Sequence, residues 1–124
     1  MKLTLDAFAA SWLDALAGKP DDFDWDAGNR AKNRKHGVEP KDVEAMFRRP
    51  RVILFAGRIE EPAHTEPRWL VLGEDGNQRR VALILTRRGE RVRPISCRPM
   101  RPKEKRAYEE AIRQQEQEED DGQA

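Results

Sequence analysis

The sequence of 124 residues is poor in the features that mark disulfide-bonded, zinc-binding or membrane proteins. Its single cysteine, Cys97, can form no disulfide within the chain and belongs to no CxxC pair. No apolar run approaches the roughly 18 residues that a membrane-spanning helix needs. Asp6 and Asp14 interrupt the charged-then-apolar pattern that a signal peptide would show. We therefore expect a soluble, cytoplasmic protein with no membrane association.

Histidine is scarce too, since His36 and His64 are the two in the sequence. Neither has a second His, Cys or acid at metal-ligand spacing, so we expect no metal and no other cofactor. Lys35 and His36 precede Gly37 at the end of a predicted helix, where the helix dipole favours positive charge. His36 could act as a general acid or base, or it could simply cap that helix.

Charged residues, by contrast, make up 38% of the chain, and their distribution is uneven. The formal net charge of +1 hides a net charge of −4 over residues 1–26, +11 over residues 27–106 and −6 over residues 107–124. A cationic centre of this size attracts phosphate-rich partners. The alternative is that these cations solvate an ordinary surface. The concentration of arginine in predicted strands and turns favours a bound polyanion.

The length predicts one domain with a modest core. Leu5, Phe8, Trp12 and Leu16 have helical spacing, which predicts a helix over residues 4–17 within an N-terminal extension, residues 1–20. A folded domain is expected over residues 21–113. The acidic segment 114–124 is expected to be disordered.

Within the domain, helices and then strands are expected in sequence order. Phe23 to Trp25 alternates as a short strand would, Asp26 is a good N-cap for a helix ending near Gly37, and a second helix is expected from Pro40 to Pro50. The later elements are predicted strands at 52–55, 69–72, 81–85 and 91–97, a loop containing Glu60 and Glu61, turns at 73–77 and 87–90, and a helix from Pro102. The fold class is therefore α+β, with N-terminal helices, an antiparallel meander and a C-terminal helix.

Arginine side chains gather on the last predicted strand. Regular alternation places Arg93 and Cys97 on one face and Arg98 on the other, unless the chain bends at Pro99. Arg91 and Arg93 could each bind a phosphate through two hydrogen bonds, or they could be exposed charges that solubilise a sheet edge. Like charges on one face repel each other without an anionic ligand, which favours phosphate binding.

Further polar residues could supply chemistry near these arginines. The Thr86 hydroxyl, close to Arg88, could orient a phosphate or be an ordinary strand-end residue. Glu66 is the best-placed carboxylate to act as a base, although with Arg68 it could form a surface ion pair of little value. Tyr108 could present its phenol to a substrate or pack in the core.

The order of these motifs resembles the BrnT family of small ribonuclease toxins from type II toxin–antitoxin systems. The resemblance covers roughly residues 23–110. Its motifs are Phe23-x-Trp25-Asp26, Asn33-x-Lys35-His36-Gly37-Val38, Glu66-x-Arg68-Trp69 with Gly73, Thr86-x-Arg88-Gly89, Arg93-x-Ile95-Ser96-x-Arg98, and Glu104 to Tyr108. The chain departs from the family pattern at Leu85, at Cys97 and in the high density of proline around residues 94–102.

This resemblance implies a RelE-like fold and a metal-independent endoribonuclease that inhibits translation. It implies a BrnA-type antitoxin as partner, with DNA reached only through the toxin–antitoxin complex. The implied site residues are Lys35, Glu66, Arg68, Thr86, Arg88, Arg93, Arg98 and Tyr108. Glu66 or Lys35 would be the base, Tyr108 or His36 the acid, and the arginines would stabilise the phosphorane. A non-catalytic nucleic-acid-binding module, and a protein that docks an acidic partner, are the alternatives.

Overall fold

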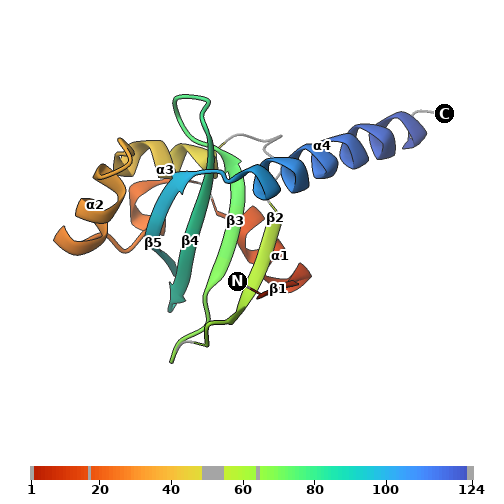
Figure 1. The fold of residues 1–124 in the computed structure, drawn as a ribbon. Helices are drawn as coiled ribbons and strands as arrows, with labels where there is room; N and C mark the ends of the chain where they lie inside the picture. The colour runs from red at the N-terminus through yellow and green to blue at the C-terminus, as the bar shows by residue number, and fades with distance from the viewer. Residues whose placement is uncertain (1, 17, 49–54, 64, 123–124) are drawn as a thin grey trace.

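The computed structural model describes residues 2–16, 18–48, 55–63 and 65–122. Its centre is an antiparallel sheet in which sequential strands are neighbours (Figure 1). The strands are β1 (Lys2–Leu5), β2 (Phe55–Glu61), β3 (Trp69–Glu74), β4 (Arg80–Arg88) and β5 (Arg91–Pro99). The helices are α1 (Ala7–Asp14), α2 (Ala27–Arg34), α3 (Pro40–Met46) and α4 (Pro102–Gly122), with a 3-10 turn at Pro20–Asp22. The predicted α+β class is confirmed, and the arrangement is compatible with a RelE-like fold.

Alternation along the strands builds one core on each face of the sheet. On one face Val71, Leu83 and Leu85 pack in a cluster that includes α1 and α3 residues. On the other face Leu70 and Leu72 pack in a cluster with residues that include Tyr108 of α4. We call this second side the α4 face. α4 begins beside the sheet and then projects beyond it (Figure 1).

A β-bulge in β5 decides where its arginines lie. Ile95 is the extra residue in the β4–β5 register. Arg93 consequently lies opposite Thr86, whereas Cys97 lies opposite Leu83. Thr86 and Leu83 are three residues apart on β4, so they face opposite sides of the sheet. The prediction that Arg93 and Cys97 share a face is therefore wrong, because one inserted residue moves Arg93 to the α4 face.

The N-terminal segment and the start of the sheet also differ from expectation. The predicted helix over residues 4–17 is instead β1 followed by α1, because Asp6 ends the strand and accepts a hydrogen bond from the Ala9 amide at 3.0 Å. Pairing with β1 extends β2 to Glu61, where a loop was predicted. Residues 52–54 of the strand predicted at 52–55 lie outside the described residues. Phe23 forms a single parallel bridge with Val92, where a short strand was predicted.

The two predicted central helices are confirmed, and α2 seals the edge of β5. Asp26 caps α2, and Gly37 follows it with a left-handed φ of 71°. The Asn29 side chain donates to the Pro94 carbonyl at 2.9 Å, and one turn later the Asn33 side chain accepts from the Cys97 amide at 2.8 Å. These bonds occupy backbone groups that an edge strand otherwise leaves open.

The C-terminal helix begins at Pro102, as predicted, and continues to Gly122. This is beyond Gln114, where the sequence predicts that the folded domain gives way to an acidic tail. In the described segments, no helix combines the length and the apolar character that crossing a membrane requires.

Candidate active site

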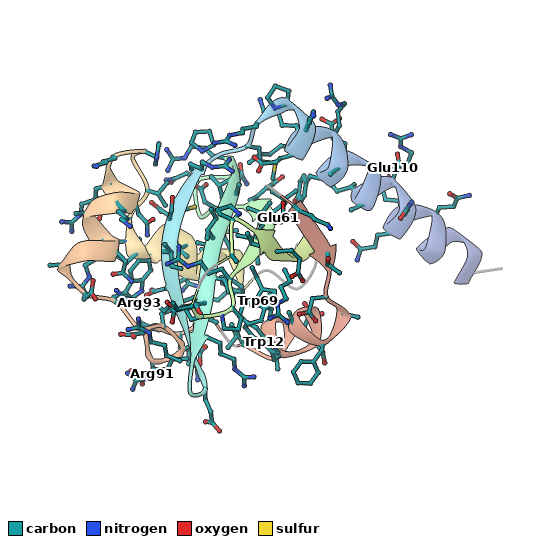
Figure 2. The ribbon with its side chains drawn as sticks, turned by 60° about the horizontal axis from the view of Figure 1, so that its bottom comes forward. Trp12, Glu61, Trp69, Arg91, Arg93 and Glu110 are labelled. Carbon is teal, nitrogen blue, oxygen red and sulfur yellow. The ribbon has the colours of Figure 1, made fainter. Side chains whose placement is uncertain are left out.

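A cleft of about 240 Å³ lies between α2 and the ends of β3, β4 and β5. Four residues predicted from the sequence line it together: Glu66, Arg68, Arg88 and Arg93. Gly28, Asn29, Lys32 and Ile95 complete its walls. Figure 2 shows Arg93 with Arg91 at this side of the molecule, well away from α4. The cleft thus gathers four cationic side chains and one carboxylate from segments that are far apart in the chain.

Local structure fixes each of these groups. The β-bulge turns Arg93 towards the cleft, and Arg88 ends β4 just before Gly89, whose φ of 61° permits a tight turn. The Arg68 carbonyl accepts from the Ile59 amide at 2.8 Å, which ties the start of β3 to β2. Buried Thr86 donates its hydroxyl to the Pro67 carbonyl at 2.7 Å and so holds the segment between Glu66 and Arg68 in place.

Carboxylates of the chain itself lie against the cleft arginines. Arg93 forms a 2.7 Å ion pair with Asp26 and lies 3.7 Å from Asp24. Arg88 lies 3.7 Å from the same Asp24 and 3.9 Å from Glu66. The Asn29 amide and Arg93 both hold the pKa of Asp26 below its ordinary value. The repulsion expected among these arginines is therefore partly relieved within the chain.

Arg68 is the cleft arginine with an unused buried donor. Its Nε atom is buried and has no hydrogen-bond partner among the described residues. An unpaired buried N–H is costly, by about 1–3 kcal/mol. A phosphate oxygen bound in the cleft would satisfy such a donor.

Arg98 also lies on the α4 face, but its partner is not one of the carboxylates beside the cleft. It makes two hydrogen bonds to Glu104 at the start of α4, at 2.7 and 2.9 Å. The Arg98 and Glu104 side chains are only 13% and 15% exposed. Burial opposes ionisation of Glu104, but the bonds from Arg98 and the Arg101 amide hold its pKa below the ordinary value. This pair joins β5 to α4 outside the cleft.

The other predicted residues also lie outside the cleft lining. Tyr108 is 3% exposed, and the Arg80 guanidinium lies 5.6 Å from its ring centre. Lys35 is exposed at the end of α2. Lys32, three residues earlier, lines the cleft instead. Lys32 and Asn29 share one face of α2, because residues three apart lie on the same side of a helix, but the sequence carries no signal that this face lines a cleft.

Cys97 is buried on the opposite side of β5, and burial raises the pKa of its thiol to about 12. A thiol in this state is a poor nucleophile. Across the described segments, no three His, Cys, Asp or Glu side chains are grouped as metal ligands.

Residues 25–104 match the family described as the ribonuclease toxin BrnT of type II toxin–antitoxin systems. The match covers more than half of the chain and includes the whole cleft lining. A search of curated proteins and a search of solved structures each return no match. Because the family match covers more than half of the chain and spans α2, α3 and β2 to β5, the chain belongs to the BrnT family of ribonuclease toxins of type II toxin–antitoxin systems.

Proposed function

We propose that this toxin is a cytoplasmic, metal-independent endoribonuclease that inhibits translation and is neutralised by a BrnA-type antitoxin. One observation carries the catalytic part of the proposal. Glu66 shares a single cleft with Arg68, Arg88 and Arg93, and its carboxylate lies 3.9 Å from the Arg88 guanidinium. A base beside several guanidiniums can both activate a nucleophile and stabilise the charge that develops during phosphodiester cleavage.

In the proposed reaction, Glu66 accepts the proton of an RNA 2′-hydroxyl. The 2′-oxygen then attacks the adjacent phosphorus, the bond from phosphorus to the 5′-oxygen breaks, and a 2′,3′-cyclic phosphate forms. Arg68, Arg88 and Arg93 stabilise the charge that develops on the phosphorane. Lys32, at the cleft wall, protonates the departing 5′-oxygen.

We propose supporting roles for the predicted residues outside the cleft lining. Thr86 positions the segment that carries Glu66 and Arg68, through its hydrogen bond to Pro67. Arg98 holds α4 against β5 through Glu104. Tyr108 anchors α4 to the sheet by packing in the core of the α4 face.

Cleavage of a defined RNA by purified toxin freed of its antitoxin tests this proposal. Glu66→Gln removes the base with little change of volume, and we expect cleavage to fall by about 10²–10⁴-fold. Glu90→Gln is the matched control, because Glu90 is exposed in the β4–β5 turn outside the cleft lining. Wild-type cleavage should persist in excess EDTA and yield a 2′,3′-cyclic phosphate.

Intact RNA after incubation with wild-type toxin would overturn the catalytic proposal. Loss of cleavage in EDTA would overturn metal independence alone. The partner proposal has its own test: co-expression with the product of the adjacent gene should restore growth and give a stable complex.

A second candidate function is RNA binding without cleavage on the same cleft. The ion pair between Arg93 and Asp26 favours it, because a carboxylate already occupies one of the guanidiniums that would stabilise the phosphorane. This function predicts salt-dependent RNA binding with no strand scission.

A further inference from the structure

A second hollow, of about 320 Å³, lies at the other end of α2. Val38, Val81 and Pro99 form apolar parts of its lining. His36, Arg79, Arg80 and Lys105 form the polar parts. We call it the basic hollow. Its residues come from the turn after α2, the starts of β4 and α4 and the end of β5, and the cleft lining does not include them.

Contacts within the chain fix the two arginines of the basic hollow in place. Arg79 pairs with the fully buried carboxylate of Asp75 at 2.9 Å and donates to the Gly37 carbonyl at 2.8 Å. Arg80 pairs with Glu109 at 2.7 Å and lies over the Tyr108 ring. A side chain that is already ordered loses little entropy when it binds a ligand.

Positive charge remains in excess in the basic hollow after these ion pairs are counted. Asp75 offsets Arg79 and Glu109 offsets Arg80, while Lys105 is exposed on the first turn of α4 with no ion pair to a described residue. The hollow therefore combines cations with apolar side chains. Single-stranded nucleic acids offer the complementary chemistry, with a charged backbone and bases that pack on apolar surfaces.

α2 links the basic hollow to the cleft. Lys32 on α2 lines the cleft, and His36, four residues later, lines the basic hollow. Four residues of extended chain span at most about 14 Å, so the two sites are neighbours. Exposed Lys35 lies between them in the sequence.

We propose that the basic hollow is a second RNA-binding site, which holds the phosphate backbone of the strand whose scissile phosphate occupies the cleft. This proposal rests on the proposed ribonuclease function and specifies the route that the RNA substrate takes across the protein surface. Lys105 and His36 contact the backbone there, and the apolar residues receive a base or ribose. The basic hollow contributes affinity for longer RNA and leaves the chemical step unchanged.

Fluorescence anisotropy with a labelled single-stranded 2′-O-methyl RNA of about 12 nucleotides tests this path, because such RNA lacks the attacking hydroxyl and its length lies within the usual range of single-strand site sizes. Lys105→Gln should reduce the salt slope by about 0.7, which corresponds to about fivefold weaker binding at 0.1 M salt. Lys103→Gln is the matched control. Lys103 is also exposed on the first turn of α4 but lines a different groove. His36→Gln should also weaken binding more than Lys103→Gln.

Equal effects of Lys105→Gln and Lys103→Gln would overturn the proposal, because general electrostatics would then explain both. No effect of Lys105→Gln, or no binding by the wild type, would also overturn it. The two proposals fail separately. A wild type that binds the long RNA through Lys105 but cleaves no RNA refutes the ribonuclease reaction alone. A wild type that cleaves RNA while Lys105→Gln matches Lys103→Gln refutes the second site alone.

Discussion

Arg93 and Arg98 leave the same strand on the same face of the sheet, yet their surroundings differ. Arg98 makes two short hydrogen bonds to one carboxylate, and that carboxylate is 15% exposed. Arg93 divides its contacts between Asp26 at 2.7 Å and Asp24 at 3.7 Å, and Asp26 is 51% exposed. The two arginine side chains are similarly buried, at 17% exposure for Arg93 and 13% for Arg98, so burial does not distinguish them.

The two arginines differ in the carboxylate with which each one pairs. A bidentate pair with a carboxylate that is itself covered leaves no room for a phosphate. The contact of Arg93 with the exposed carboxylate of Asp26 can be exchanged for a contact with a phosphate. We therefore propose that the cleft end of the α4 face binds the ligand, whereas the end that α4 covers supports the structure.

Among the variants that test this comparison, Arg93→Gln should have the largest effect, and that effect is on cleavage. In the proposed reaction Arg93 stabilises the phosphorane, so removing its charge should lower the cleavage rate by about 10²–10³-fold. Its stability should change by about 1 kcal/mol or less, since the lost partner Asp26 is exposed. Single-turnover cleavage and urea unfolding measure the two effects. If Arg93→Gln unfolds readily but cleaves at the wild-type rate, Arg93 has a structural role and not a catalytic one.

Arg98→Gln should show the opposite pattern. Loss of its charged hydrogen bonds to Glu104 should lower the free energy of unfolding by about 1–3 kcal/mol. Cleavage measured well below the unfolding transition should stay close to that of the wild type. A large loss of cleavage by the fully folded variant would instead place Arg98 in the active site.

Acid should weaken the contact between Arg98 and Glu104. The folded-state pKa of Glu104 is lower than its ordinary value of 4.5. Its stabilising contribution is therefore present above the unfolded-state pKa and is lost as pH falls through the folded-state pKa. Urea unfolding at several pH values below about 5 should show a smaller acid-induced loss for Glu104→Gln than for the wild type. Parallel pH profiles would contradict this assignment.

The smallest expected effect concerns Asp24, whose carboxylate lies 3.7 Å from both Arg88 and Arg93. Asp24→Asn should free these guanidiniums and tighten binding of a non-cleavable RNA by up to about fivefold. Asp21→Asn, an exposed position with the same change of charge, is the control. If both variants bind alike, Asp24 does not compete with RNA. Weaker binding by Asp24→Asn would instead mean that it orients the arginines.

Local sequence rules predicted much of this fold. Asp26, Gly37 and Pro40 mark helix boundaries through backbone chemistry that acts within a few residues, and the structure confirms all three. The long-range features were harder to predict. β1 forms through pairing with β2, which lies more than fifty residues later in the chain.

Part of the cleft was also predictable from local sequence. The motifs around Glu66, Arg68 and Arg88 each lie on a short segment, and the structure brings them together. The side of the sheet that Arg93 occupies depends on the bulge at Ile95, which alternation alone does not reveal. Lys32 and Asp24 enter the cleft region because α2 packs along the edge of β5, a tertiary contact without a local sequence signal.

NMR of the arginine Nε–Hε groups during titration with the non-cleavable RNA shows directly whether RNA binds in the cleft. We expect the signals of Arg68 and Arg93 to shift as RNA binds, with the largest change at the unpaired Nε of Arg68. The signal of Arg98 should stay in place because Glu104 continues to hold its guanidinium. Shifts at Arg98 with none at Arg68 and Arg93 would contradict the assignment of the cleft as the RNA site.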